Sequence, residues 1–131
     1  MSSLAYLDSS AVVKSIVEEA ESGALNLFLR SFQTHASSEL ARTEVVRAVR
    51  RGQPFALPRA FEALERLVLI ELSQTVLDAA GLLDPPTLRS IDALHLATAQ
   101  VLSPQLGALV TYDERMASAG AALGLPVEVP R

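Results

Sequence analysis

The fold of this chain is decided by residues 88–99, whose sequence is LRSIDALHLATA. Ser90 is a typical helix N-cap, and neither Gly nor Pro interrupts the run that follows it, so the stretch predicts a helix. Apolar side chains occur on nearly every side of this helix, which predicts that it is buried. Asp92 nevertheless stands in its first turn, and a buried carboxylate is costly unless a positive or hydrogen-bonding group meets it. Asp92 therefore either complements the helix N-terminus or belongs to a functional site.

The length of 131 residues suits one domain with one core, so we expect residues 1–131 to form a single domain. Half of the residues are hydrophobic, which is enough for a substantial core. The absence of cysteine excludes disulfides and thiolate metal sites and is compatible with a reducing compartment. No signal-peptide pattern or membrane-spanning apolar run occurs, so the expected location is the cytoplasm, with no membrane partner.

The formal net charge of −4 is unfavourable for a protein that covers phosphates with a broad positive surface. Ten of the eleven basic residues are arginine, however, and four of them fall within residues 42–51. Arginine suits bidentate contacts with phosphate. This segment is either a solvated helix face or part of a phosphate-binding surface.

Apolar strand-like runs alternate with helical patterns along the chain, and this order is typical of βαβ units with a parallel sheet. The expected helices include residues 39–51 and a last helix that begins at 113–115. The expected strands are residues 4–7, 34–37, 69–72 (at an edge of the sheet), 108–112 and 127–129. We therefore predict an α/β fold with a central parallel sheet flanked by helices.

Four acidic residues occupy unusual positions in this scheme. Asp8 and Asp113 directly follow strands, and ligands bind at the carboxyl ends of parallel strands. Glu44 lies on the apolar side of helix 39–51, and Asp92 begins the helix described above. Each acid alone could be a helix cap or one half of an ion pair. Together they predict four carboxylates that converge at one edge of the sheet.

A cluster of carboxylates repels itself unless some are protonated or a cation neutralises them. Oxygen ligands without cysteine favour a hard ion, Mg²⁺ or Mn²⁺. An ion held in this way can activate a bound water and stabilise the charge that develops on a phosphate. The acids and the arginines together are thus compatible with hydrolysis of a phosphodiester, because the acids would bind the metal rather than the nucleic acid.

The same residues resemble a known family. In order, the matching segments are YLDSSAVVK (6–14), SELARTEV (38–45), LRSIDALHLA (88–97) and TYDER (111–115). Over nearly its whole length the chain is similar to PIN-domain ribonucleases of the VapC toxin type. The resemblance implies the PIN fold, Mg²⁺- or Mn²⁺-dependent endonucleolytic cleavage of RNA, a cognate VapB antitoxin that inhibits the toxin, and a homodimer.

The resemblance also implies roles for individual residues. The acidic quartet of the family corresponds to Asp8, Glu44, Asp92 and Asp113, with Asp8 and Asp92 as direct metal ligands and the other two completing the site directly or through waters. Small hydroxyl residues that support the acids correspond to Ser10 and Thr111. Glu114 is the only additional acid beside Asp113, whereas members often have more, so a second metal ion is left open.

Three basic residues near these motifs need separate interpretation. Lys14 and Arg89 are close to the acids in sequence, and we hypothesise that they hold the RNA backbone. His95 follows Asp92 by one helical turn, and we expect a buried histidine with a local hydrogen bond rather than a ligand or a base.

Three alternatives remain. Asp8 could be the nucleophile of a phosphatase that forms an aspartyl-phosphate, although Ser10 stands where haloacid-dehalogenase-type enzymes carry a second Asp. The chain could instead be a non-catalytic PIN-like module that binds a partner. It could also be an α/β domain in which the four acids are only helix caps.

Overall fold

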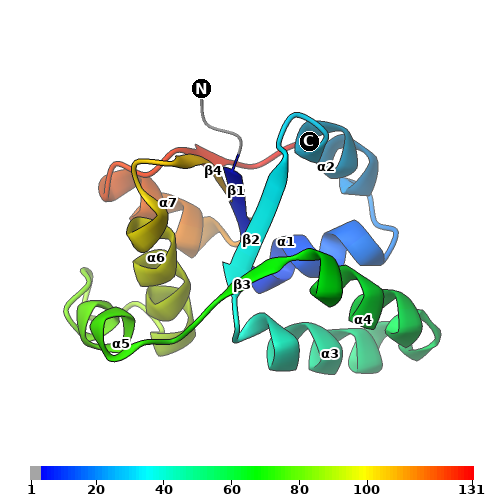
Figure 1. The fold of residues 1–131 in the computed structure, drawn as a ribbon, viewed down its shortest axis with the longest axis horizontal. Helices are drawn as coiled ribbons and strands as arrows, with labels where there is room; N and C mark the ends of the chain where they lie inside the picture. Colours follow the sequence, from blue (N-terminus) through cyan, green and yellow to red (C-terminus); the bar gives the residue numbers. More distant parts are fainter. Residues whose placement is uncertain (1–3) are drawn as a thin grey trace.

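A computed structural model describes residues 4–131, and its centre is a five-stranded sheet (Figure 1). The strand order is β3-β2-β1-β4-β5, and every neighbouring pair is parallel. The strands are β1 (Leu4–Leu7), β2 (Thr34–Ser38), β3 (Val68–Ile70), β4 (Leu106–Val110) and β5 (Val127–Glu128). The predicted α/β class and parallel sheet are therefore confirmed, with β3 at the edge as expected.

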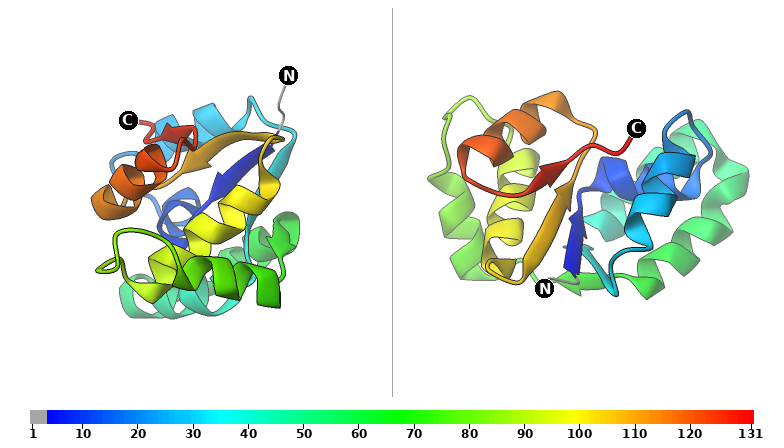
Figure 2. Two further views of the ribbon diagram at one scale, coloured as in Figure 1. Left: turned by 90° about the vertical axis from the view of Figure 1, so that its left-hand side faces the viewer. Right: turned by 90° about the horizontal axis from the view of Figure 1, so that it is seen from above.

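Helices cover both faces of this sheet (Figure 2). The first group packs on one face and comprises α1 (Ser9–Ile16), α2 (Ser22–Leu29), α3 (Ala41–Gly52) and α4 (Leu57–Arg66), with a short 3₁₀ turn at Pro54–Ala56. The second group contains α6 (Ser90–Leu102) and α7 (Glu114–Ala122) on the opposite face, and α5 (Gln74–Gly81) packs against α6. Among residues 4–131, no helix is long and apolar enough to cross a membrane.

The two cores follow from the two-residue period of the strands. Ala5 and Leu7 of β1 point toward the core that contains α1–α4, while Tyr6 points toward α6 and α7. In β4, Ala108 and Val110 belong to the first core and Leu109 to the second. Strands that are buried on both faces in this way are almost continuously apolar, as their sequences are.

The connections place a topological switch point between β1 and β4. From the central strand β1 the chain continues to β2 and β3 on one side of the sheet, and it then crosses to β4 and β5 on the other side. In such sheets the crevice at the carboxyl ends of the two strands next to the switch point is the usual ligand site. Asp8 follows β1 directly, and Thr111 follows β4 directly.

The structure corrects three details of the predicted helices. Ser90 was expected as the N-cap of α6, but it is the first residue of the helix. Arg89 occupies the N-cap position and makes no side-chain hydrogen bond there. The same helix is not buried on all sides, since Ile91 is 40% and Val101 is 53% exposed. Helix α3 begins at Ala41 instead of residue 39.

Candidate active site

A cavity of about 320 Å³ opens at the carboxyl ends of β1 and β4. Its lining includes all four acids singled out in the sequence, Asp8, Glu44, Asp92 and Asp113. Two of them follow strands, and the other two lie on α3 and α6. The structure therefore brings together carboxylates that are up to 105 positions apart in the chain, from Asp8 to Asp113.

Asp8 is the most deeply buried acid of this cavity, with 2% of its surface exposed. One carboxylate oxygen, Oδ1, accepts the backbone N–H of Ala11 at 2.9 Å and the hydroxyl of Ser10 at 2.7 Å. The other, Oδ2, accepts the hydroxyl of Thr111 at 2.6 Å. Burial raises the pKa of Asp8 above its ordinary value, although these three hydrogen bonds oppose the shift. Asp8 is thus both the N-cap of α1 and a wall of the cavity.

Glu44 belongs to a chain of hydrogen bonds that continues into the core. Its Oε1 accepts the Ser9 hydroxyl at 2.7 Å and lies 2.8 Å from Nε2 of His95. Burial by itself would raise the pKa of Glu44, but the hydrogen bonds from His95 and Ser9 outweigh it and hold the pKa below its ordinary value. Because an ionised carboxylate only accepts, Nε2 of His95 carries the proton that bonds Glu44.

The other nitrogen of His95, Nδ1, is then free to accept the hydroxyl of Tyr6 at 2.7 Å. Burial, and after it the charge of Asp8, raises the pKa of Tyr6 well above its ordinary value, so this hydroxyl keeps its proton. Both rings are buried and meet edge to face. The series Tyr6–His95–Glu44 therefore fixes the position of the Glu44 carboxylate from inside the second core.

Arg89 joins the two remaining acids. Its Nε donates to Asp92 Oδ2 at 3.0 Å, and one terminal nitrogen donates to Asp113 Oδ2 at 3.1 Å. The hydrogen bond and charge of Asp92, followed by the charge of Asp113, raise the pKa of Arg89 further. The Arg89 side chain is 64% exposed, whereas that of Asp92 is 5% exposed. A solvated cation thus neutralises a buried anion.

Asp113 has a structural contact as well as this ion pair. Its Oδ1 caps α7 by accepting the backbone N–H of Met116 at 3.0 Å. Its own backbone N–H donates to the Thr111 hydroxyl at 3.1 Å, and that hydroxyl in turn donates to Asp8. Capping is therefore correct for Asp8 and Asp113, but it does not account for Glu44 or Asp92.

The donor set suits a hard divalent cation, because carboxylate oxygens from four segments line one cavity. In the arrangement that the structure holds, however, no three His, Asp or Glu side chains among residues 4–131 lie close enough to share one metal ion. Arg89 already bridges Asp92 and Asp113, and His95 with Ser9 engages Glu44. Asp92 and Asp113 could therefore hold a cation only if Arg89 left them.

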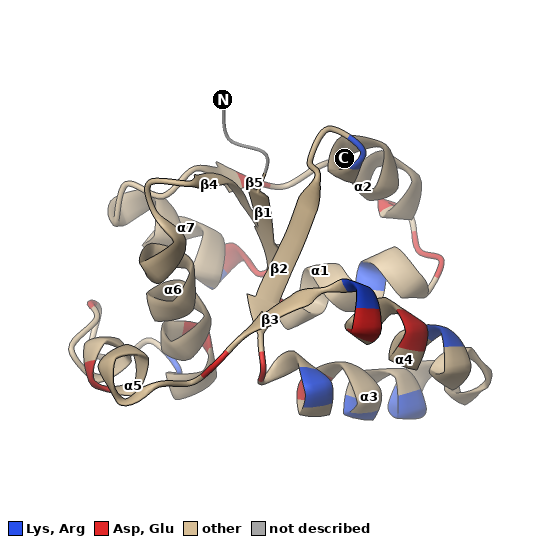
Figure 3. Ribbon diagram, in the orientation of Figure 1, with Lys and Arg blue, Asp and Glu red and all other residues tan. Residues whose placement is uncertain are grey.

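The other basic residues lie at different distances from this cavity. The Lys14 ammonium pairs with Glu21 at 2.7 Å and Glu19 at 3.4 Å and lies over the Tyr112 ring, 4.7 Å from its centroid. The Lys14 side chain is 13% exposed and that of Arg89 is 64% exposed, so Arg89 is the more accessible of the two to an RNA backbone. The exposed arginines of α3 form a separate row, seen as repeated blue segments in Figure 3.

Two residues of the site were missed in the sequence, Ser9 and Tyr6. Their contacts are with residues 35 and 89 positions away, so no local spacing could reveal them. The one available signal was Tyr6 itself, because a tyrosine in a buried strand needs a partner for its hydroxyl. The predicted burial of His95 is confirmed, but its hydrogen bonds are long-range rather than local.

Comparison with known proteins agrees with this arrangement. The PIN domain family matches residues 5–122. A Mycobacterium tuberculosis protein named ribonuclease VapC46 is 49% identical over 125 residues, which are 95% of this chain and 96% of the relative. Among solved structures, M. tuberculosis VapC20, described as a sarcin–ricin loop cleaving toxin, gives a TM-score of 0.76 at 15% identity and covers 97% of this chain and 99% of its own.

A second solved structure is a toxin–antitoxin complex from Klebsiella pneumoniae, of which one chain gives a TM-score of 0.72 at 22% identity, covering 97% of this chain and 98% of that one. These two structures establish the likeness of fold, while the family match and the relative with near half of its residues identical establish kinship. The chain therefore belongs to the PIN-domain family and, within it, to the VapC ribonucleases.

Proposed function

We propose that this chain is an endoribonuclease that hydrolyses RNA phosphodiester bonds in the acidic cavity, and that it is the toxin of a VapBC pair. The observation that carries the proposal is the convergence of Asp8, Glu44, Asp92 and Asp113 on one cavity at the switch point of the sheet. Membership in the VapC ribonucleases supports the choice of RNA as substrate.

The proposed cofactor is Mg²⁺ or Mn²⁺, held by Asp8 and Asp92 with Glu44 and Asp113 completing the site. When bound, such an ion supplies an activated water and neutralises charge on the phosphate. The residues of the chain hold the acids in position for this ion. Ser10 and Thr111 keep both oxygens of Asp8 in place. His95 and Ser9 hold Glu44, and the first turn of α7 holds Asp113.

Arg89 has two proposed positions in this cycle. Without a cation it neutralises Asp92 and Asp113. If these acids held a cation, the solvated guanidinium of Arg89 would be available for the RNA phosphate, which it could bind with two hydrogen bonds. Arg89 is thus the RNA-backbone contact that the geometry supports best. Lys14 stays a predicted contact.

The proposed protein partners are a VapB-type antitoxin and a second copy of the chain. Kinship with VapC ribonucleases supports the antitoxin. The apolar side chains that remain exposed on α4 and α5 favour these helices as contact surfaces, since Phe61 is 52% and Leu77 is 47% exposed. Light scattering of the chain and of a Phe61→Glu variant tests the dimer, and loss of the dimer in the variant is expected.

The decisive experiment compares two Asp→Asn variants on a mixed RNA pool. Asp92→Asn removes an acid of the cavity that caps no helix, and Asp78→Asn is a matched control on the exposed surface of α5. We expect Mn²⁺-dependent cleavage by the wild type, abolition by EDTA, a loss on the order of 100-fold or more in Asp92→Asn, and none in Asp78→Asn. Equal loss in both variants, or cleavage that EDTA does not affect, would contradict the proposal.

The same purified protein also distinguishes the ribonuclease from two alternative functions. A phosphatase with Asp8 as nucleophile predicts an aspartyl-phosphate that can be trapped, but Ser10 stands where such enzymes of the haloacid-dehalogenase type carry a second Asp. A non-catalytic module predicts partner binding without any RNA cleavage by the wild type.

A further inference from the structure

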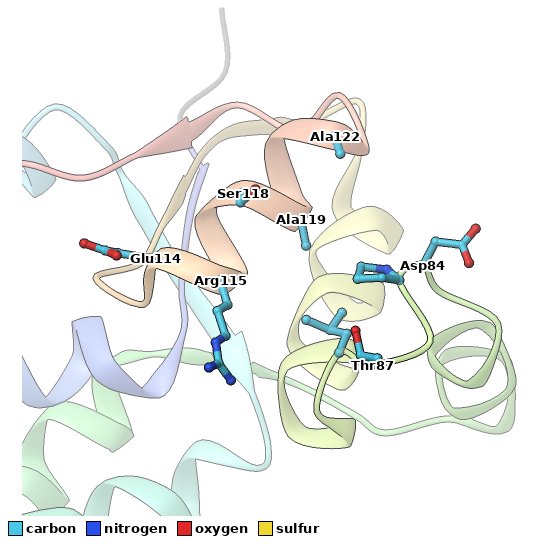
Figure 4. A pocket seen from close by; sticks show the side chains of 9 residues that line it. Asp84, Thr87, Glu114, Arg115, Ser118, Ala119 and Ala122 are labelled. Carbon is cyan, nitrogen blue, oxygen red and sulfur yellow. The ribbon is translucent and has the colours of Figure 1, made fainter.

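A second cavity, of about 850 Å³, lies beside the acidic cavity between α7 and the segment that precedes α6. Figure 4 shows Ser118, Ala119 and Ala122 along the helix on one side and Thr87 with Asp84 on the other. None of the acids of the proposed active site lines this cavity. It has no role so far in the proposed reaction.

Residues that are adjacent in the sequence line the two cavities. Leu88 lines the larger cavity and Arg89 the acidic one, while Glu114 lines the larger cavity and Asp113 the acidic one. The two cavities thus adjoin along both the start of α7 and the segment before α6, so an RNA whose scissile phosphate lies among the acids can extend toward the larger cavity. Ligand pockets of roughly 300–1,000 Å³ are common, so there is room for one base.

The chemistry of the lining suits a base better than a phosphate. Pro85, Leu88, Ala119 and Ala122 supply an apolar surface, on which the flat face of a base can rest. Thr87 and Ser118 place hydroxyls at this surface, and hydroxyls can pair with the edges of a base.

Arg115 adds the one cation of this lining. Its side chain is exposed, and within residues 4–131 no carboxylate lies within ion-pair distance of it. In Figure 4 the carboxylates of Glu114 and Asp84 point away from the space between α7 and the facing segment. Arginine planes stack on unpaired bases and also attract the flanking phosphate.

From this geometry we infer that the cavity between α7 and residues 84–88 is a subsite for one unpaired base adjacent to the scissile phosphate, and that it sets part of the sequence preference of cleavage. The inference rests on the proposed ribonuclease function. Arg115 stacks on the base, the apolar floor receives it, and Ser118 and Thr87 discriminate between bases.

The test fills the cavity and reads the sequences at which RNA is cut. Ser118→Trp places a large side chain on the cavity face of α7, and Arg115→Ala removes the stacking group without adding volume. The matched control is Ala121→Trp, which is exposed on the same helix but does not line the cavity. Circular dichroism melts of all variants establish that they fold.

On a random-sequence RNA pool with Mn²⁺, we expect the wild type and Ala121→Trp to show the same base bias at a position next to the cut. Ser118→Trp and Arg115→Ala should both reduce that bias about tenfold, since stacking of a base on a side chain contributes an effect of at least this order. Biases at other positions should be unchanged.

Unchanged base preferences in both cavity variants would overturn the inference while leaving the ribonuclease proposal intact. Loss of inhibition by a co-expressed cognate antitoxin with unchanged preferences would also overturn it, in favour of a protein ligand. Failure of the folded wild type to cut any RNA in the pool would remove the proposed function and this subsite with it.

Discussion

Replacement of Thr111 by Val tests whether the buried Asp8 carboxylate depends on side-chain hydroxyls. Thr111 is fully buried, and its hydroxyl donates to Asp8 Oδ2 at 2.6 Å. Valine has nearly the same shape, so the change removes the hydroxyl without opening a large cavity. A hydrogen bond to a charged group contributes about 1.5–3 kcal/mol. The backbone N–H of Asp113 also loses its acceptor, so we expect the free energy of unfolding to fall by about 2–3 kcal/mol.

The assay is urea unfolding at neutral pH in EDTA, which keeps cations out of the cavity. Thr98→Val is the matched control, because Thr98 is equally buried but donates at 2.7 Å to a neutral acceptor, the backbone carbonyl of Leu94. We expect a loss of about 1 kcal/mol there. In an Asp8→Asn background the two valine variants should cost similar amounts, since the charged acceptor is gone. A loss in Thr111→Val no larger than in Thr98→Val would refute the reasoning.

Three further perturbations follow from the same contacts. Arg89→Ala removes the cation that competes for two of the acids, so titration calorimetry should show Mn²⁺ binding about threefold to tenfold tighter, and equal or weaker binding would contradict the bridging role. Burial raises the pKa of Asp8, so the folded state holds a proton at pH values where the unfolded chain has lost it. Stability of the metal-free protein should therefore fall as pH rises from the ordinary pKa through the raised one. In a series of urea melts at different pH, Asp8→Asn should lack this fall of stability with pH. The same fall in Asp8→Asn and in the wild type would contradict its assignment to Asp8. Tyr6→Phe leaves Nδ1 of His95 without a partner, so a loss of about 1–2 kcal/mol is expected, and an unchanged melting temperature would exclude that bond.

The convergence of the acids was accessible from sequence because it follows from topology. Asp8 comes directly after β1, as predicted, whereas β4 ends at Val110 rather than at residue 112, so Asp113 lies three residues beyond it. Both acids are still near the edge at which the parallel strands end. Glu44 could be placed because helix periodicity puts it among apolar neighbours. Each of these inferences uses a local pattern and one general rule of sheet geometry.

The partners of the acids were not accessible in the same way. His95 reaches Glu44 across 51 residues, and Arg89 reaches Asp113 across 24, through contacts that depend on how α6 is seated against the sheet. The exposure of Ile91 could not be predicted from the sequence for a related reason. Hydrophobicity indicates that a helix is apolar, but which side of it faces neighbours is decided by tertiary packing.

The cavity is assembled from acids that are each neutralised or hydrogen-bonded by the chain itself, and the partners differ in how easily they can leave. Asp8 is held by the buried Thr111 hydroxyl and Ala11 backbone N–H, and also by the hydroxyl of the exposed Ser10. Glu44 is held by a histidine that is fixed in turn by Tyr6. Among residues 4–131, Arg89 is the arginine that pairs with these acids, and it lies largely in solvent, where its ion pairs are weakened by water and salt. If these acids held a divalent cation, Arg89 would be the partner that could leave them with the least disturbance of the fold. Arg89 would then be available to a phosphate placed among the acids, so the proposed cation binding and the proposed RNA binding would support each other through one side chain.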